Sequence, residues 1–264
     1  GDLQSYRVGD IVRQVNAELS DGCNEVWLTS TDNGCYGFDI DSDLPELVHT
    51  VSEIPQKFFI RVGMMNPMYM PRIRDGLLKS FESTKVFKFL HIPVQSGSDK
   101  VLNDMKRGHT AQTFRDVTNH FRNKFEKFTI STDVIVGFPT ETIDDFEQTL
   151  QLLQETKPDI VNLSRYSRRP GTDAAEMKQI DVAEVKRRSK IAYELITKIS
   201  NENNRKWIGW EGHVIFDEEY EGQIRGRNFA YKPIFVKEMP KIGQILNVRI
   251  TDATNHSLIG KIIS

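Results

Sequence analysis

The stretch FLHIPVQSGSDKVLNDMKRGHT, from Phe89 to Thr110, decides the fold. Its first part, Phe89 to Val94, is apolar and typical of a buried strand. A polar turn from Gln95 to Ser98 follows at once, and the start of a helix then leads to Arg107. A strand that passes directly into hydrogen-bonding groups, with a cation nearby, indicates a binding site where the strand ends.

The same order of strand, polar segment and helix recurs on both sides of this stretch. Strands are predicted in five segments: EVWLTSTDNG from Glu25, KFFIRVGMMNP from Lys57, VFKFLHIPVQSGS from Val86, FTISTDVIVGFPTET from Phe128 and DIVNLSRYSRRPGT from Asp159. Helices are predicted around them: Arg7–Ser20, PELVHTVSEI from Pro45, RIRDGLLKSF from Arg72, TAQTFRDVTNHFRNKF from Thr110, TIDDFEQTLQLLQET from Thr142 and a long basic helix over about Asp181–Asn203. This alternation predicts an α/β fold with a parallel sheet, either open or closed into a barrel.

Each predicted strand ends in a polar segment, in chain order TSTDNG, MMNP, PVQSGS, GFPTET and RYSRRPGT. In parallel α/β folds every βα loop opens at the carboxyl edge of the sheet, so these segments should meet there. Ordinary turns would account for their glycines and prolines. Gln, Thr-Asp-Asn and Arg-Arg at the same edge favour a ligand site.

The pattern changes after about Asn204. Five short segments with turn signals between them, WEGHVIF, GQIRGRN, KPIFVK, QILNVRIT and SLIGKII, predict a small OB-like β-barrel over residues 204–264. One part of it mixes cations with aromatic residues, which suits phosphate contact and base stacking. These candidate RNA-binding residues are Arg225, Arg227, Phe229, Tyr231 and Lys232. A packing module with a few surface arginines is the alternative.

Composition excludes several classes of protein. The 264 residues carry a formal net charge of -2, so nucleic-acid binding would need a local basic surface. No run of about 18 apolar residues predicts a membrane span, no signal peptide opens the chain, and a cytoplasmic protein is expected. Cys23 and Cys35 form neither a disulfide framework nor a compact metal motif, so no metal ligands are predicted.

The motifs resemble those of a known family, the radical S-adenosylmethionine methylthiotransferases. The match is closest to the archaeal and eukaryotic branch that acts on threonylcarbamoyladenosine in tRNA. It rests on EVWLTSTDNGCYGFDI, RVGMMNP, HIPVQSGSD with MKR, TDVIVGFPTETIDDFEQTL and SRYSRRPGTDAAEM, in the family's order and spacing. The resemblance implies a partial, open TIM-like barrel over residues 1–203 and a TRAM domain, an RNA-binding barrel, over residues 204–264.

The resemblance also implies a site. Gln95 and Ser96 would contact the amino-acid or ribose part of S-adenosylmethionine, and Arg107 would pair with its carboxylate through a planar donor fork. The segment from Gly137 to Glu141 would line the adenine pocket. The remaining candidates are Ser30 and Asp32 for the amino group of the cofactor, and Arg165, Arg168 and Arg169 for RNA phosphate or the threonyl carboxylate, with a structural salt-bridge role as the alternative.

One departure from the family concerns its clusters. The family holds two 4Fe–4S clusters, one of them on a CxxxCxxC motif, and thiolates are the usual ligands. This chain begins with Gly1-Asp2-Leu3-Gln4-Ser5-Tyr6-Arg7, which resembles the family's segment directly after that motif, so the motif, the first barrel strand and the amino-terminal domain are expected to be missing. No cluster is therefore expected in this chain, which should be inactive as written.

For the full-length parent, the resemblance implies methylthiolation of C2 of the modified adenosine next to the anticodon. Two alternatives remain open. One is a methylthiotransferase for isopentenyladenosine in tRNA or for a ribosomal-protein aspartate. The other is an RNA-binding fragment without chemistry.

Overall fold

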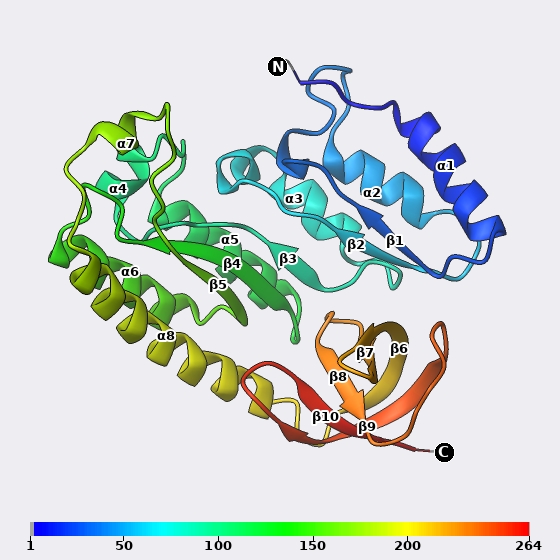
Figure 1. Cartoon of the computed structure of the whole chain (residues 1–264). Helices are drawn as coiled ribbons and strands as arrows, with labels where there is room; N and C mark the ends of the chain where they lie inside the picture. The colour runs from blue at the N-terminus through cyan, green and yellow to red at the C-terminus, as the bar shows by residue number, and fades with distance from the viewer. Residues whose placement is uncertain (1–2, 264) are drawn as a thin grey trace.

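The computed structural model describes residues 3–263, so Gly1 and Asp2, on which part of the expected amino-terminal boundary rests, lie outside the described part. The chain forms a β/α core followed by a carboxyl-terminal barrel, and the long helix α8 (Val182–Arg205) leads from one to the other (Figure 1). Among residues 3–263, none of the helices combines the length and the apolar composition that a membrane crossing needs.

The core strands run parallel to one another, which confirms the predicted α/β class. They are β1 (Glu25–Leu28), β2 (Phe59–Val62), β3 (Phe89–His91), β4 (Thr129–Val136) and β5 (Ile160–Arg165). β1 pairs with β2, while β3, β4 and β5 form a second group in that order. A bridge between Ile60 and Val86, with a 3.0 Å bond from the Phe87 amide to the Ile60 carbonyl, links the two groups into one open array.

β3 ends sooner than its apolar run predicts, at His91 instead of Val94. The hydroxyl of Thr132 on β4 donates to the Ile92 carbonyl (2.8 Å) and accepts from the Val94 amide (3.0 Å). A side chain thus satisfies backbone groups that a ladder would otherwise pair. Pairing between the backbones resumes at the bridge between Gln95 and Val134.

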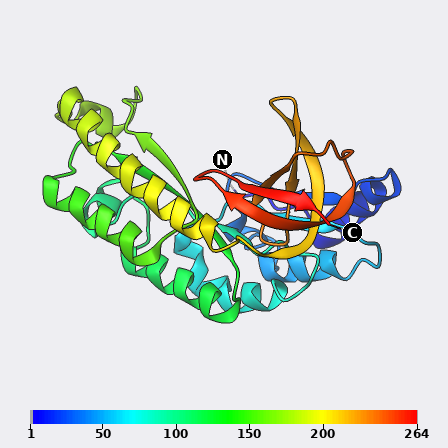
Figure 2. The same ribbon diagram turned by 90° about the horizontal axis from the view of Figure 1, so that it is seen from below.

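The long helices cover one face of the strands, and each packs beside the next along the chain (Figure 2). They are α1 (Val8–Ser20), α2 (Leu44–Ser52), α3 (Met70–Ser80), α5 (Ala111–Lys124), α6 (Ile143–Thr156) and α8, with the short elements η1 (Asn33–Cys35), η2 (Pro67–Tyr69), α4 (Asp99–Asp104) and α7 (Asp173–Glu176) in the loops. Local side chains set where helices begin: Thr110 and Thr142 form capping boxes at the starts of α5 and α6.

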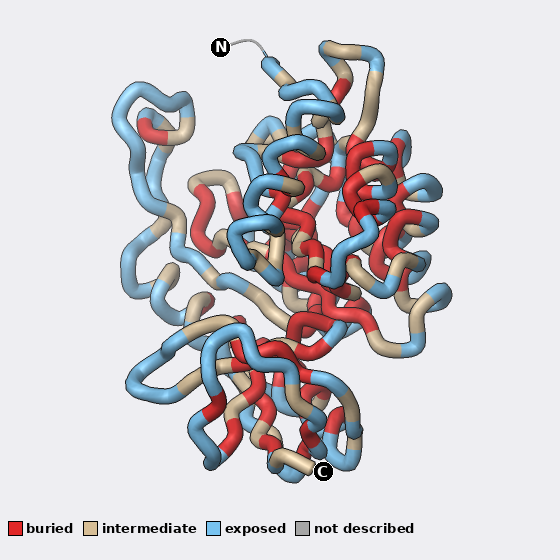
Figure 3. The backbone as a smooth tube through the Cα atoms, turned by 90° about the vertical axis from the view of Figure 1, so that its right-hand side faces the viewer, coloured by how far each residue is buried: buried red, intermediate tan, exposed pale blue. Residues whose placement is uncertain are grey.

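Buried residues concentrate along the strands and the inner faces of these helices (Figure 3). At the centre, Phe81 of the α3 end meets Phe121 of α5 edge-on, with ring centroids 5.7 Å apart, and Phe128 lies 5.0 Å from Phe121. Such aromatic contacts add to the apolar burial that holds the helix layer on the strands.

The carboxyl-terminal barrel closes in the strand order β10-β8-β7-β6-β9, which confirms the predicted five-stranded barrel. Its strands are β6 (Glu211–Tyr220), β7 (Gln223–Arg227), β8 (Pro233–Val236), β9 (Ile245–Ala253) and β10 (Leu258–Ile262). Gly260 is required where β10 crosses β9, because a Cβ there would lie 2.3 Å from Val248.

The barrel docks against the amino end of β3. The Lys88 amide donates to the Phe229 carbonyl (2.7 Å), and the Tyr231 ring lies 4.8 Å and 5.2 Å from the rings of Phe87 and Phe89. Tyr231 is only 6% exposed, and Ile215 of β6 is buried in the same cluster. The junction is therefore an apolar interface and not a loose tether.

A buried ion pair lies at the same junction. The Lys232 ammonium donates to Asp159 Oδ1 (2.8 Å) and to Asn204 Oδ1 (3.1 Å), and the Lys232 side chain is 2% exposed. Asp159 precedes β5 and also accepts from the Ile130 amide (3.0 Å) and from Arg122 (3.4 Å). One lysine thus joins the barrel, the start of β5 and the end of α8.

A second charged contact crosses the junction between β1 and β6. Arg227 Nε lies 3.7 Å from Asp217 Oδ2, and the charge of Glu25 also acts on Asp217. Within the described residues, Glu25 Oε2 and Asp217 Oδ1 are buried without a hydrogen-bond donor. Burial raises the pKa of Asp217 to about 7, Arg227 opposes this rise, and Glu25 adds to it.

Replacing Lys232 by methionine should destabilise the protein, because it leaves the Asp159 carboxylate buried without its ammonium partner. Breaking a buried pair from one side costs about 3–5 kcal/mol, and the remaining donors to Asp159 favour the lower end, so we expect the free energy of unfolding in urea to fall by about 3 kcal/mol. Lys237→Met, at an exposed lysine of the same barrel, is the control and should change it by less than about 0.5 kcal/mol. Equal effects of the two substitutions would contradict the assignment.

The raised pKa of Asp217 predicts a dependence of stability on pH. The carboxyl keeps its proton up to about pH 7 when folded but has an ordinary pKa of 3.8 otherwise, so its contribution is fully present below about pH 4 and is lost as the pH rises toward 7. Thermal unfolding across this range should show a flatter pH dependence for Asp217→Asn than for the unaltered chain. Asp252→Asn, at an exposed site on β9, should keep the original dependence. An unchanged profile for Asp217→Asn would exclude this carboxyl as the source.

Candidate functional site

The five core strands are parallel, so their following loops lie at one edge of the array. Most of the residues predicted for the site are brought to this edge: Ser30 and Asp32 after β1, Gln95 and Ser96 after β3, Gly137 and Glu141 after β4, and Arg165, Arg168 and Arg169 at and after the end of β5. The sequence therefore predicts where the site lies, and the contacts of each side chain decide what each residue can do there.

Asp32 ties two of the loops together. Its Oδ1 accepts from the Gly34 amide (2.9 Å) and from the Asn66 amide (3.0 Å), so the loops after β1 and β2 share one acceptor. Asn33 adds a bond from its side-chain amide to the Met64 carbonyl (3.0 Å). Ser30 stays exposed beside them.

The polar groups of the turn after β3 form hydrogen bonds mostly with other groups of the protein. Ser96 is fully buried: its hydroxyl lies 3.3 Å from that of Thr149 on α6 and accepts from the Ser98 amide (3.2 Å). Gly97 is pressed against α6, where a Cβ would lie 2.4 Å from the Gln148 carbonyl. The Ser96 hydroxyl thus fixes the turn to the helix, and a contact of Ser96 with a cofactor stays a prediction.

Gln95, in the same turn, is also buried, at 7% exposure. It has a left-handed backbone (φ 72°), yet its amide still donates to the Asp133 carbonyl (2.8 Å) and its carbonyl accepts from the Ile135 amide (2.9 Å). Such a conformation is costly for a residue other than glycine and persists only where the surroundings impose it. Among the hydrogen bonds of residues 3–263, none involves its side-chain amide, so a contact of Gln95 with a ligand stays a prediction.

Glu141 holds the loop after β4 through buried hydrogen bonds. Its Oε1 accepts from the Gly137 amide (3.1 Å) and from Arg188 of α8 (2.6 Å), which also reaches Glu184 (2.8 Å). The Glu141 side chain is 1% exposed, and burial raises its pKa while Arg188 opposes the rise. Glu141 thus holds the turn at Gly137 (φ 82°), where α8 packs so closely that a Cβ would lie 2.7 Å from Val185, and its place in an adenine pocket stays a prediction.

Arg107 is half-buried behind the β3 turn. Burial lowers its pKa, while the charge of Asp133 raises it. Arg107 Nε is buried without an acceptor among the described residues. The ring of His109 holds this segment in place, because its nitrogens lie 3.1 Å from the Arg107 carbonyl and 3.2 Å from the Val94 carbonyl. A guanidinium with an unused donor suits an anionic ligand group.

A polar cluster that the motif analysis missed lies on the inner face of the strands. Asp133 of β4 accepts from Asn162 of β5 (2.7 Å) and lies 3.2 Å from His91 of β3. Burial raises the pKa of Asp133, but the bonds from His91 and Asn162 and the charge of Arg107 outweigh it and hold that pKa below its ordinary value. The only sequence signal is polar residues at alternate positions of otherwise apolar strands.

Comparison with known proteins identifies this arrangement. The model of the radical SAM superfamily matches residues 1–153, more than half of the chain, and the model of the TRAM domain matches residues 214–263. The chain belongs to the radical SAM superfamily. The resemblance inferred from the motifs is confirmed, and the carboxyl-terminal barrel is its TRAM domain.

Two curated relatives show how far the likeness extends. The chain is 42% identical over 267 residues to a probable threonylcarbamoyladenosine tRNA methylthiotransferase of Archaeoglobus fulgidus, covering 99% of this chain and 62% of that protein. It is 38% identical over 267 residues to the threonylcarbamoyladenosine tRNA methylthiotransferase of Drosophila melanogaster, covering 100% of this chain and 48% of that protein. The chain thus spans about half to six-tenths of the length of these relatives.

A solved structure supports the fold alone. Coproporphyrinogen III oxidase (HemN) from Escherichia coli, described as a radical SAM enzyme, is 14% identical and superposes with a TM-score of 0.56 over 95% of this chain and 63% of that chain. At this identity the match establishes the architecture and says nothing of substrate.

The cysteines do not fit an iron–sulfur cluster held by these residues. Cys23 precedes β1 and Cys35 follows it, so they lie at opposite ends of a strand. Among residues 3–263, no group of three or more His, Cys, Asp or Glu side chains could hold a metal ion. A radical SAM cluster normally needs a set of thiolates, which Cys23 and Cys35 do not supply.

The predicted RNA-binding face of the barrel is revised for two of its residues. Tyr231 and Lys232 are 6% and 2% exposed in the junction with the core, where neither can stack on a base or contact a phosphate. Arg225 pairs with Glu218, and Arg227 lies 3.5 Å from the same carboxylate. Phe229 keeps 36% exposure beside Trp207. Aromatic residues mixed with cations indicated RNA binding in the sequence, but here they mainly build a domain interface.

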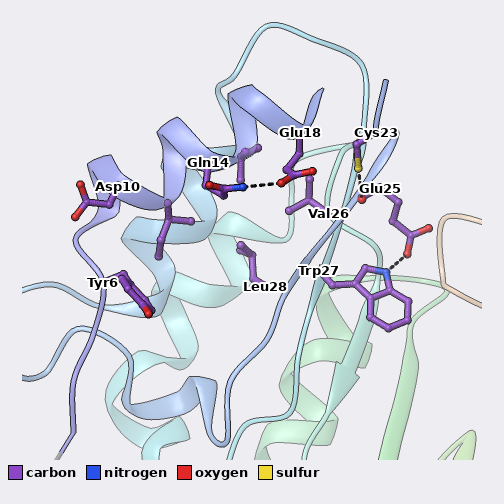
Figure 4. A pocket seen from close by; sticks show the side chains of 11 residues that line it. Tyr6, Asp10, Gln14, Glu18, Cys23, Glu25, Val26, Trp27 and Leu28 are labelled. Atoms are coloured by element: carbon purple, nitrogen blue, oxygen red, sulfur yellow. Dashed lines mark hydrogen bonds between the residues drawn. The ribbon is translucent and has the colours of Figure 1, made fainter. Parts of the chain in front are cut away.

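A groove of about 600 Å³ lies away from this site, between α1 and the outer edge of β1 (Figure 4). Val26 and Leu28 give it an apolar wall, while Gln14 bonds Glu18 and Trp27 bonds Glu25 along its rim. Asp10 pairs with Arg13 outside the groove, and these polar groups do not converge on a common point. The groove is therefore no alternative to the strand-end site.

The support that α8 gives to the strand-end loop can be tested in this chain. Arg188→Met removes the buried partner of Glu141 and should lower the free energy of unfolding by about 3 kcal/mol, because it leaves a carboxylate buried at 1% exposure. Arg187→Met, at the neighbouring exposed arginine, should have little effect. Urea unfolding measures both, and similar values for the two would mean that the buried pair does not hold the loop.

Proposed function

We propose that this chain is the radical SAM and TRAM portion of an enzyme that methylthiolates C2 of N6-threonylcarbamoyladenosine next to the anticodon of a cytoplasmic tRNA. The observation that carries the proposal is the 42% and 38% identity, over essentially the whole chain, to an archaeal and an animal protein of that name. The TRAM domain adds a module suited to RNA.

The strand-end residues support S-adenosylmethionine binding. The side-chain amide of Gln95 can hydrogen-bond the amino-acid or ribose part, and the unused Arg107 donor can pair with the carboxylate. The turn at Gly137, held by the buried Glu141 pair at the carboxyl end of β4, is the part of this loop that we assign to the adenine. When bound, this group supplies the radical and methyl-transfer chemistry, and the residues of this chain bind and orient it and exclude water.

The inner-face cluster suits the reacting end of the site. Asp133 is held ionised by His91 and Asn162, and the charge of Arg107 faces it. A carboxylate fixed by two donors keeps lone pairs for one further donor, such as a hydroxyl or an amino group of the bound molecules. Arg165, Arg168 and Arg169 stand exposed at the mouth, where Arg168 has Glu176 at 3.6 Å. They suit RNA phosphate or the threonyl carboxylate.

The activity is tested in cells that lack the gene. Mass spectrometry of tRNA nucleosides should show loss of the methylthio derivative and accumulation of threonylcarbamoyladenosine, with recovery when the full-length gene is restored. Loss of a methylthiolated isopentenyladenosine, or unchanged nucleosides, would contradict the proposed substrate.

The role of Arg107 is tested by binding. In the full-length protein, Arg107→Ala should weaken S-adenosylmethionine binding by about 1.5–3 kcal/mol, the range for a hydrogen bond to a charged group. Lys106→Ala is a matched control, since the neighbouring ammonium is 77% exposed and pairs with Asp173 at 2.7 Å. Calorimetric titration distinguishes them, and unchanged affinity for Arg107→Ala would remove this residue from the site.

A further inference from the structure

Three adjoining hollows run along α8 and β5. The first lies at the end of β5 and includes Arg165 and Gln179, with about 660 Å³. The second, of about 420 Å³, also includes Arg165 and continues to Lys190 and Tyr193. The third, of about 470 Å³, shares Tyr193 with the second and ends at His256 in the barrel. Neighbouring hollows share lining residues, Arg165 between the first two and Tyr193 between the last two, and we call the row of three the α8 groove.

The α8 groove joins the strand-end site to the barrel. It begins at Arg165, at the carboxyl end of β5, and ends at the β9–β10 turn, residues 254–257. The Asn204 side chain fixes this turn to the end of α8 by a bond to the Thr254 carbonyl (2.9 Å). β5 has six residues, so the groove is about 20 Å long at roughly 3.3 Å per residue. Figure 2 shows this turn of the barrel near the carboxyl end of α8.

The charged groups of the groove are mainly cations. Arg165 and Lys186 are exposed and have no carboxylate within 4.0 Å among the described residues. Lys190 lies 4.0 Å from Glu194, and both are strongly exposed, so that contact is weak. Asp159, a carboxylate that lines the third hollow, is neutralised by its ion pair with Lys232. The groove is therefore locally basic on a chain with a net charge of -2.

An aromatic ring stands in the middle of these cations. Tyr193 is 54% exposed, although its neighbours Ala192 and Ile196 on the helix are buried. It lines the second and the third hollow, and His256 adds a second flat ring at the barrel end. Cations that follow a strand of phosphates, with rings on which bases stack, are the features of single-stranded nucleic acid sites.

We propose that the α8 groove binds a single-stranded segment of RNA, with phosphates on Arg165, Lys186 and Lys190 and a base stacked on Tyr193. The identity of this RNA, a tRNA anticodon loop, rests on the proposed function. In this arrangement RNA that enters at the β9–β10 turn is led toward the carboxyl ends of the strands. Tyr231 and Lys232 were predicted to bind RNA but are buried. We assign to the α8 groove the contact of one RNA with both the barrel and the core.

The test is fluorescence anisotropy with the whole chain and a labelled, unmodified anticodon stem-loop RNA at several salt concentrations. Tyr193→Ala should weaken binding about ten-fold with the salt slope unchanged, because stacking is not ionic. Tyr193→Phe should restore most of the affinity. Lys186→Ala should make the log–log salt slope shallower by about 0.7, the value for one phosphate contact on a single strand.

Lys198→Ala is the matched control, because Lys198 is an exposed lysine of α8 that lines none of the three hollows. It should keep the affinity and the slope. Equal behaviour of Tyr193→Ala, Lys186→Ala and the unaltered chain would overturn the proposal and leave the groove to a protein partner. Because the probe is unmodified RNA and the readout is binding, this outcome is separate from the nucleoside analysis that tests the activity.

Discussion

The ion pair between Lys232 and Asp159 sets the position of the barrel on the core. Its ammonium is 2% exposed and bonds a carboxylate at the start of β5 and an amide oxygen at the end of α8. A buried charge is tolerated only when it is paired and hydrogen-bonded, so few other placements of the barrel would satisfy this lysine. The aromatic cluster around Tyr231 buries apolar surface, and the ion pair fixes the orientation of the barrel on the core.

That placement has consequences for function. It covers the amino ends of the strands with the barrel and leaves the carboxyl ends open, where Gln95, Gly137 and Arg107 lie. It also brings the β9–β10 turn beside α8, so that the basic groove runs from the barrel to the open ends. The site and the groove therefore depend on the same interdomain contact.

The sequence predicts the fold well because the fold follows from local patterns. Strand and helix periods, capping residues such as Thr110 and Thr142, and five polar strand ends are all read within short windows. The location of the site follows from topology alone. The roles of single residues do not, because they depend on partners far along the chain. Ser96 meets Thr149 and Glu141 meets Arg188, and each supports a loop through a partner that the sequence does not indicate.

The barrel shows even more clearly that the role of a single residue depends on partners that the sequence does not indicate. Cations and aromatic residues at positions 225–232 suit an RNA surface, and they suit a domain interface equally well, because desolvated rings and paired charges stabilise both. Burial alone separates the two, and nothing in a single sequence predicts that Lys232 faces Asp159 across 73 residues. The α8 groove could not be predicted from the sequence either, because Arg165, Tyr193 and His256 come from three separate parts of the chain.

Photo-crosslinking of a 4-thiouridine-labelled anticodon stem-loop to the chain, with mass spectrometric mapping, tests most directly that the docked barrel and α8 present one RNA path. Crosslinks should fall on Tyr193 and on residues 254–257, at the two parts of the groove that the junction brings together. Crosslinks confined to residues 225–229, or spread evenly over the exposed surface, would contradict it.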